Sequence, residues 1–312
     1  MEMNIMLDNV LRLITIVIFP GGIFLMLAGL MYEWIDRKML AQVQNRVGPR
    51  WFQPLADVVK LLAKEEIIPV HVDRRLFIGL PIFALAGALT AGLYVPIAGL
   101  QRSFSFPGDL IVTLYLLSLY TLCIGLAGSN THDRYSLVGA TRTLTQLFSY
   151  EAPFLLAILG PAIVAGTWQI NEITASIGSR WLLFTQPFGF LVAVIGLMGI
   201  LELPPFDAPE AETEIVAGAL TEYSGRGLAL FRLGKGVELL IGLTLIAAFY
   251  LGGVTNPLLF IVKTLTLLLC MTGLRALFTR LRIDQTVGLW WRYGTLLVLG
   301  QWIVMIVLRS AV

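Results

Sequence analysis

Apolar stretches alternate with polar connections along the whole chain, and each stretch is close to the length that crosses a lipid bilayer. A transmembrane helix needs about 20 predominantly apolar residues. Eight stretches meet this requirement, at roughly 11–32, 76–98, 110–128, 145–167, 182–201, 236–254, 257–278 and 291–309. The pattern predicts an all-α polytopic membrane protein with about eight transmembrane helices, forming a single integral membrane domain over residues 1–312.

The composition agrees with this interpretation. The mean hydropathy is +0.82, and hydrophobic residues make up 57% of the chain. A water-soluble protein of this length would expose far too much apolar surface. The first apolar stretch has neither a basic start nor a small-residue cleavage site, so we expect it to be retained as a span. The lipid bilayer is an expected partner, and a net charge of +2 gives no reason to expect nucleic acid as another.

The basic residues predict how the chain is oriented. Connections one, three, five and seven hold 15 of the 22 Lys and Arg residues, whereas connections two, four and six hold 2. Basic loops remain on the cytoplasmic side of a membrane. We therefore expect a multi-pass protein of the cell membrane with its odd-numbered loops in the cytoplasm and both termini outside.

The first connection, residues 33–75, carries a second pattern. Its apolar residues recur at helical spacing, at Leu55, Val58, Val59 and Leu62. Such spacing predicts an amphipathic helix lying on a surface. Two interpretations remain open: the helix anchors the loop at the membrane interface, or it forms one wall of a site that opens to the cytoplasm.

The fifth connection, residues 202–235, is rich in acids. Six of the 20 acidic residues lie between positions 202 and 222, and no Lys or Arg lies there. Asp207 and Glu210 have the spacing of a capping box that opens a helix, and Glu214 would then share a helical face with Glu210. The apolar residues 215–220 predict that the loop is partly re-entrant.

Acids placed this close together cannot all ionise if they are buried, so at least one would hold a proton. The loop is therefore a candidate proton relay. The alternative is a fully solvated acidic surface, which would carry no such function.

Single charged residues also interrupt the apolar stretches. A charged, unpaired Glu151 in the fourth stretch would cost about 2–4 kcal/mol, so it is expected to face the bundle interior, to be protonated, or to pair with Arg142. Glu238 lies one turn after Lys235, and a local ion pair is expected between them. No role for Lys263 can be predicted.

Other residue types point away from bound metals. Cys123 and Cys270 lie far apart in apolar segments, which predicts two buried structural thiols and no iron–sulfur or zinc site. His71 and His132 are expected to be solvated loop residues. Trp290 and Trp291 are expected to form an aromatic anchor at the membrane interface.

Four segments together resemble one family. They are EWIDRKMLAQVQNRVGP (33–49), QPLADVVKLLAKEEIIP (53–69), SLVGATRTLTQLFSYEAP (136–153) and PPFDAPEAETEIVAGALTEYSG (204–225). In this order they resemble the H subunit of respiratory complex I, called subunit 1 in mitochondria, and its relatives in membrane-bound hydrogenases. The resemblance implies eight spans and a site at the junction between the membrane arm and the peripheral arm.

The resemblance also implies roles for individual residues. The family's glutamates at matching positions start a proton path, here Glu151, Glu210, Glu212, Glu214 and Glu222. Other matching positions imply residues that line the cavity or the junction between the arms, here Asp36, Arg37, Lys38, Lys64, Glu65, Arg282 and Asp284. Trp291 also matches the last of these family motifs.

Three departures from respiratory members fall around the implied quinone tunnel. Only residues 50–52 separate Pro49 from Gln53, a shorter segment than in respiratory members. Glu202 and Leu203 stand where those members have Asn-Arg, and Lys235 replaces a glutamate. The changes favour a quinone-free relative: a membrane-bound hydrogenase or a sulfur-reducing complex linked to ferredoxin. A quinone-reducing complex of the complex I type is the alternative.

The resemblance thus implies the membrane-arm anchor subunit of a multisubunit energy-converting oxidoreductase that does no redox chemistry alone. Its expected partners are the peripheral iron–sulfur and large catalytic subunits and antiporter-like membrane subunits that move H⁺ or Na⁺. We expect no cofactor in this chain. Iron–sulfur clusters, with nickel–iron in the hydrogenase type, belong to the partners, and quinone enters only under the alternative. A stand-alone secondary transporter and a passive scaffold are interpretations of other classes.

Overall fold

The fold is built from helices. A computed structural model of the protein describes residues 13–100 and 104–310, except the side chains of Glu212 and of residues 308–310. No strand occurs within these ranges, where the β-structure is limited to one isolated bridge between Ile97 and Leu100. The helices are α2 (Gly22–Val43), α3 (Gln53–Ala63), α4 (Arg74–Tyr94), α5 (Asp109–Asn130), α6 (Arg134–Ala165), α7 (Ile170–Ile177), α8 (Leu182–Thr185), α9 (Pro187–Ile200), α10 (Glu212–Ile215), the 3₁₀-helix η1 (Gly218–Leu220), α11 (Gly225–Tyr250), α12 (Pro257–Leu277), α13 (Ile283–Leu289), the π-helical segment η2 (Trp290–Gly294) and α14 (Thr295–Ser310).

The predicted all-α membrane fold is confirmed. Each of the eight apolar stretches contains a helix. Among the described residues, six helical segments are long and apolar enough to cross a membrane: residues 13–43, α4, α5, α6, α11 and α12. The helices α9 and α14, which belong to the fifth and eighth predicted spans, have 14 and 16 residues.

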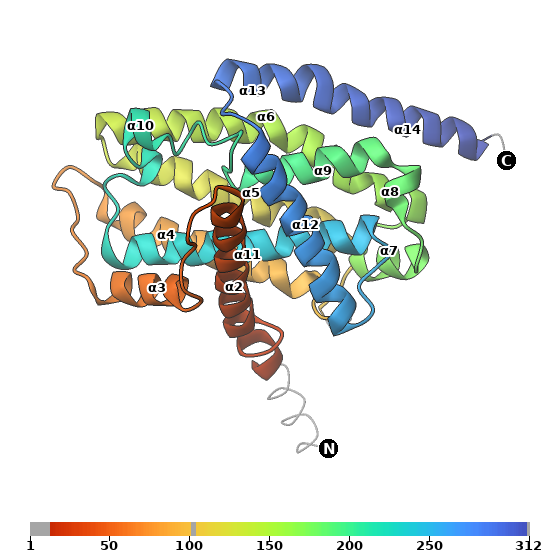
Figure 1. Ribbon diagram of the computed structural model, residues 1–312, viewed down its shortest axis with the longest axis horizontal. Coiled ribbons are helices and arrows are strands. Elements are labelled where there is room, and N and C mark those ends of the chain that lie inside the picture. The colour runs from red at the N-terminus through yellow and green to blue at the C-terminus, as the bar shows by residue number, and fades with distance from the viewer. Residues whose placement is uncertain (1–12, 101–103, 311–312) are drawn as a thin grey trace.

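Helix α11 lies at the centre of the molecule. In Figure 1 it runs along the long axis together with α4, α6 and α9, while α2 and α12 cross it at an angle. Almost the whole second half of α11 is buried, and it packs against α2, α4, α9 and α12. A Cβ atom at Gly29 of α2 would stand 2.6 Å from the backbone of Gly236. The two glycines thus let α2 and α11 cross in direct backbone contact, as small residues do between membrane helices.

Two helices begin earlier than the hydropathy pattern predicts. The third connection was expected to be a polar loop, but α6 already begins at Arg134, where Asp133 caps it by accepting hydrogen bonds from the backbone of Tyr135 and Ser136. Helix α11 begins at Gly225, not near residue 236. A side-chain cap thus marks the start of α6, whereas α11 begins without one, at Gly225, whose φ is 58°. Polar residues in the first turns do not prevent helix formation.

The predicted surface helix in the first connection is α3. Of its four predicted apolar contacts only Val58 is buried, and Leu61 is buried beside it against α11 and α2. Leu55, Val59 and Leu62 are instead exposed. The apolar stripe is therefore split between a face that packs on the bundle and a face turned outward.

The acidic loop is not a helix over most of its length, so the predicted capping box at Asp207 is wrong. Helix α10 covers only four residues and begins after Ala211, because Pro204, Pro205 and Pro209 interrupt the preceding backbone. Further along, η1 packs against α5 and α6. A Cβ atom at Gly139 of α6 would stand 2.3 Å from the backbone of Ala219, so only glycine permits this close approach.

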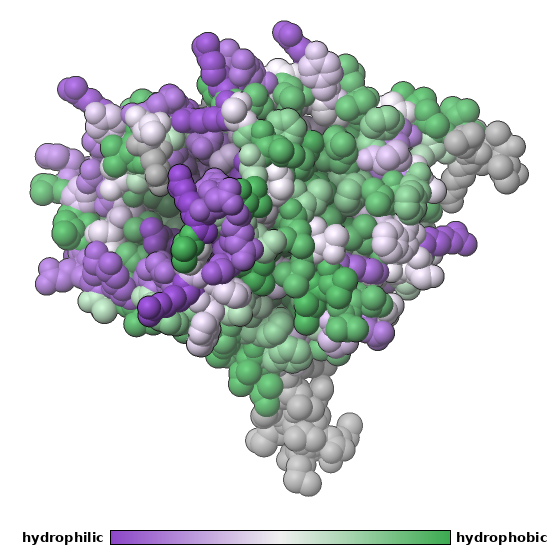
Figure 2. Space-filling view, viewed as in Figure 1, coloured by the Kyte–Doolittle hydropathy of each residue, from purple (hydrophilic) through white to green (hydrophobic). Residues whose placement is uncertain are grey.

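Hydrophilic side chains gather at one end of the molecule. Figure 2 shows them over the part where α3 and α10 lie in Figure 1, whereas apolar side chains cover most of the rest of this face. The charged end holds the acidic loop and the end of α2. The apolar part of this face is suited to lipid.

Three smaller expectations change. Cys123 is buried but Cys270 is exposed on α12. Trp290 is buried against Phe206, so only Trp291 has the exposure expected of an interfacial residue. Lys263 donates hydrogen bonds to the carbonyls of Gly252 and Gly253, at 3.2 and 2.8 Å. This contact stabilises the carbonyls at the end of α11 and gives Lys263 a structural role.

Candidate functional site

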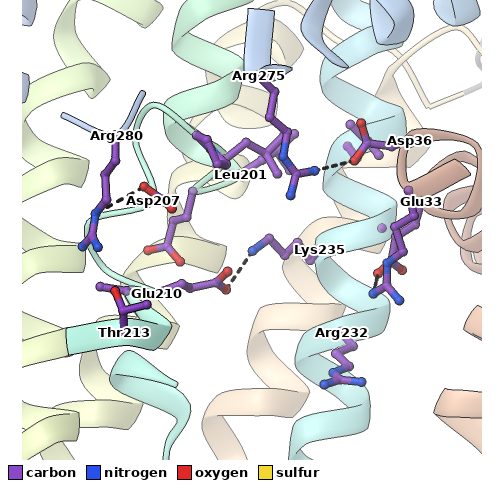
Figure 3. Close-up of a pocket in the computed structure, with 17 residues that line it drawn as sticks. Glu33, Asp36, Leu201, Asp207, Glu210, Thr213, Arg232, Lys235, Arg275 and Arg280 are labelled. Atoms are coloured by element: carbon purple, nitrogen blue, oxygen red, sulfur yellow. Dashed lines mark hydrogen bonds and ion pairs between the residues drawn. The ribbon is translucent and has the colours of Figure 1, made fainter. Parts of the chain in front are cut away.

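A cavity of about 670 Å³ opens at the charged end. It lies between α2, α11, the acidic loop and the end of α12 (Figure 3). Ten of the lining residues carry ionisable charges, five of each sign: Glu33, Asp36, Arg37, Glu202, Asp207, Glu210, Arg232, Lys235, Arg275 and Arg280. The cavity therefore concentrates charge without a large net excess of either sign.

Cations from distant segments neutralise the acidic loop. Lys235 of α11 donates a hydrogen bond to Glu210, with Nζ 2.7 Å from Oε1. Arg280, which follows α12, lies 3.4 Å from a carboxylate oxygen of Asp207. Figure 3 shows these side chains converging on the cavity from different elements. The expectation that Glu210 and Glu214 repel each other on one helical face is wrong, because Glu210 precedes α10 and each acid has its own cation.

Glu214 faces a second cavity, of about 420 Å³, on the other side of the loop. Arg142 of α6 donates a hydrogen bond of 2.7 Å to Glu214, and Arg280 lies 3.4 Å from it. The hydrogen bond from Arg142, with the charge of Arg280, lowers the pKa of Glu214. Arg142 and Arg280 also donate to the carbonyl of Ala208, which holds the loop in place.

The end of α2 forms the opposite wall of the first cavity. Asp36 is buried and accepts hydrogen bonds of 2.7 Å from Arg275 and from the hydroxyl of Thr272, both on α12. Arg37 pairs with Glu33 one turn earlier and lies 3.8 Å from Asp57 of α3. These contacts connect α2, α3 and α12 around the cavity.

Glu202 is the buried acid of this cavity. Its backbone is in the left-handed region, with φ of 50°, which costs a non-glycine residue roughly 1 kcal/mol or more. Its side chain is 5% exposed, and Oε1 has no hydrogen-bond partner among the described residues. Burial, reinforced by the charge of Glu210 and opposed by that of Lys235, raises the pKa of Glu202 to about 7. A carboxyl group with this pKa exchanges protons near neutral pH.

Glu238 does not pair with Lys235, contrary to expectation. Lys235 is directed to Glu210 in the cavity, whereas Glu238 is completely buried inside the bundle. Neither carboxylate oxygen of Glu238 has a hydrogen-bond partner in the described part of the chain.

The remaining predicted site residues are more dispersed. Glu151 is half-buried on α6 and lines neither cavity, and the Arg142 that was its candidate partner binds Glu214 instead. Glu222 is half-buried after η1, and the side chain of Glu212 lies outside the described residues. Lys64 and Glu65 are exposed after α3 and line neither cavity.

The last junction residues also lie outside the first cavity. Arg282 and Asp284 form an exposed ion pair of 3.4 Å at the edge of the second cavity. Lys38 is half-buried, and its aliphatic carbons lie close to the backbone of Gly48.

The structure adds residues that sequence reasoning did not place in the site. They are Glu33, Arg142, Glu202, Arg232, Lys235, Glu238, Arg275 and Arg280. Arg142 and Arg280 lie 66 or more residues from the groups they bind, so local spacing carries no signal for them. The sequence did offer one signal for Glu202. Together with Leu203 it replaces the family's Asn-Arg before the PFD motif.

The fold and the site define a membrane protein whose polar end combines a charged cavity with a loop held by ion pairs. Comparison with known proteins identifies its family. A family model described as NADH dehydrogenase matches residues 14–306. The chain belongs to this family, the H subunits of complex I-like membrane oxidoreductases.

Its relatives come from several complexes. The chain is 35% identical to the H subunit of the NADH-quinone oxidoreductase of Carboxydothermus hydrogenoformans, over 86% of this chain and 81% of the relative. It is 32% identical to the H subunit of the F(420)H(2) dehydrogenase of Methanosarcina acetivorans, over 88% and 87%. It also resembles a chain of a membrane-bound sulfane sulfur reductase, an archaeal respiratory membrane complex, with a TM-score of 0.83, 25% identity and coverage of 90% and 96%.

Proposed function

We propose that this protein anchors the peripheral arm of a ferredoxin-linked, energy-converting membrane oxidoreductase and transmits its redox events to ion-moving neighbours. Glu210, Glu212, Glu214, Glu222 and Glu151 form the proposed glutamate relay. Antiporter-like subunits receive the signal and move H⁺ or Na⁺. The odd-numbered loops face the cytoplasm, where the peripheral iron–sulfur and catalytic subunits bind.

One observation carries this proposal: the acidic loop is held by ion pairs to three different elements around a cavity that also contains a titratable buried acid. Lys235 binds Glu210, Arg142 binds Glu214, and Arg280 lies between Asp207 and Glu214. A new charge at the cavity mouth would change which partners are favoured. Because the pKa of Glu202 is about 7, such a change alters its proton occupancy at neutral pH.

Quinone reduction is the second candidate, and it is favoured by the names of the curated relatives, several of which belong to NADH-quinone oxidoreductases. A site for a quinone ring and its tail is expected to be mostly apolar. Ten charged residues line the cavity of this chain, and the residues present do not fit such a ligand. We therefore favour a quinone-free acceptor, with the sulfur-reducing or hydrogen-evolving type first.

Alanine substitution of Glu212 or Glu214 in the whole complex tests the relay. We expect the variants to assemble but to lose ion transport per electron transferred, or to turn over more slowly. Glu172→Gln is the matched control, because Glu172 is an exposed acid on α7 that lines neither cavity. Wild-type coupling in both alanine variants contradicts the relay.

Purification distinguishes the classes of protein. Co-purification with iron–sulfur and antiporter-like subunits supports the complex, whereas ion transport by the solitary chain supports a secondary transporter. Loss of assembly alone in the acidic-loop variants supports a passive scaffold. Electron-acceptor assays with a quinone analogue, protons and a sulfur compound decide the acceptor.

A further inference from the structure

Glu238 is a buried acid that the proposed relay does not use. It lies in the middle of α11, one residue before Leu239 and three after Lys235, both of which line the charged cavity. Its side chain is 0% exposed, yet both carboxylate oxygens lack a hydrogen-bond partner among the described residues. An ionised, unpaired carboxylate is strongly unfavourable inside a membrane bundle. Its surroundings therefore favour the neutral, protonated acid.

Lys235 does not supply Glu238 with an ion-pair partner. Lys235 exerts an electrostatic effect on Glu238, but its ammonium group donates to Glu210 at 2.7 Å. Glu33 and Glu202 act on Lys235 as well. The charge of Lys235 is thus shared among several acids.

Glu202 and Glu238 are electrostatic neighbours. Glu202 lines the cavity, is 5% exposed and has one unpaired oxygen, and the same cavity is lined by Leu239, the neighbour of Glu238 on α11. Its left-handed backbone holds the side chain at a position where glycine or asparagine would be less strained. One buried and incompletely bonded carboxyl group therefore lines the cavity, and a second belongs to the residue next to a lining residue.

Two buried tyrosines are electrostatic neighbours of Glu238. Tyr150 of α6 is buried, donates a hydrogen bond of 3.2 Å to Thr121, and is an electrostatic neighbour of Glu238, Glu202 and Glu151. Tyr120 of α5 is also near Glu238, but its hydroxyl donates to the carbonyl of Phe231. Tyr150 is thus the group that relates the buried acids to Glu151, which lines neither cavity.

We propose that Glu202 and Glu238 form a two-carboxyl step that carries a proton from the charged cavity into the bundle, toward Tyr150 and Glu151. In each transfer the protonated Glu238 first gives its proton toward Tyr150 and Glu151, and the Glu202 carboxyl group then gives its proton to the Glu238 carboxylate. A proton from the cavity restores Glu202, so the pair returns to its starting charge. The step rests on the proposed function, since it supplies the inner part of the relay. This step replaces the close contact between Glu210 and Glu214 that the sequence predicted and the loop does not form.

The test uses the intact complex in sealed vesicles, with ion uptake and electron transfer measured together. Glu238→Gln keeps the shape of the side chain but cannot exchange a proton, and we expect ion uptake per electron to fall by about 100-fold. Glu202→Gln should have the same effect, and Glu238→Asp should restore part of the coupling. Thr244→Val is the control on the same helix, because its buried hydroxyl donates to the carbonyl of Leu240 one turn earlier, and it should behave as wild type.

Infrared difference spectra give a second readout. A protonated Glu238 contributes a carboxylic-acid C=O band that disappears in Glu238→Gln and shifts in Glu238→Asp. If Glu238→Gln does not assemble, Glu238→Asp gives the answer. A carboxylic-acid C=O band shifted from its wild-type position, together with partial coupling, supports the step, and a band at the wild-type position overturns it.

The outcomes separate this inference from the proposed function. If Glu210→Gln and Glu214→Ala uncouple the complex while Glu202→Gln and Glu238→Gln remain coupled, the two-carboxyl step is wrong and the loop relay stands. If all four variants remain coupled, both proposals are wrong.

Discussion

The acids of the loop and the acids beside α11 differ in how their charge is accommodated. Glu210 and Glu214 are partly exposed, and each has a cation within 2.7 Å that comes from another helix. Glu202 and Glu238 are buried and have carboxylate oxygens without partners in the described structure. The first pair therefore has ion-pair partners, whereas burial without partners makes charge on the second pair unfavourable. The comparison separates acids whose charge is balanced by a nearby cation from acids that are buried without one.

Asp36 differs from Glu202 and Glu238 because it is a buried acid that has a cation as its partner. Asp36→Ala leaves Arg275 on α12 without its carboxylate, and we expect a loss of about 4 kcal/mol in stability, typical of a broken buried pair. Thermal denaturation of the complex measures the effect. The control is Thr272→Val, which removes only one hydrogen bond and should cost about 1 kcal/mol. Equal effects would show that Arg275 does not depend on Asp36.

The inner acids should make stability depend on pH. The pKa of Glu202 is about 7, above its ordinary value of 4.5, so the folded state binds more protons than the unfolded state between these two values. The contribution of Glu202 to stability is therefore complete at low pH, falls as the pH rises toward 7, and is lost above it. The full difference is about 3 kcal/mol.

Glu202→Gln removes the titrating group and should abolish this part of the pH dependence, making the variant more stable than wild type at pH about 8. Melting curves from acidic to alkaline pH, with Glu172→Gln as the control, measure it. An unchanged pH profile in Glu202→Gln would place the titration on another group.

Lys235 is the cation next to both the loop acid Glu210 and the buried acids, and its removal should have a smaller effect on stability. Lys235→Met leaves Glu210 unpaired, but Glu210 is 43% exposed and water can solvate it, so we expect a loss of about 1 kcal/mol. The double variant Lys235→Met, Glu210→Gln should recover part of that loss. Chemical denaturation of the four proteins in this cycle gives the coupling energy, and strict additivity would show that the ion pair contributes nothing.

The outermost pair should have the smallest effect. Glu214 is 51% exposed, and its contact with Arg142 is open to solvent screening. Arg142→Gln should change the melting temperature slightly at low salt and not at high salt. A loss of stability that persists at high salt would show that Arg142 acts mainly through the carbonyl of Ala208.

The sequence predicted the helices better than the site. Apolar stretches of about 20 residues have few alternatives in a membrane, so all eight contain helices. The helix starts at Arg134 and Gly225 were missed because a hydropathy pattern locates apolar residues only, and both helices begin with polar residues outside the apolar stretches.

The site depends on contacts between distant parts of the chain. The spacing of Glu210 and Glu214 predicted a repelling pair, but prolines end the helix on which that reasoning relied. Lys235 was expected to bind Glu238, three residues away, because local pairs are visible in a sequence. Its actual partner lies 25 residues away, and only the packing of the loop over α11 brings the two together.

Glu210→Gln shows whether charge at the cavity is coupled to ion movement. The measurement is the number of ions taken up per electron transferred by the intact complex in sealed vesicles, with Glu172→Gln alongside. We expect Glu210→Gln to transfer electrons but to move far fewer ions per electron, while Glu172→Gln retains the wild-type ratio. A wild-type ratio in Glu210→Gln would mean that the charge of Glu210 is not coupled to ion movement.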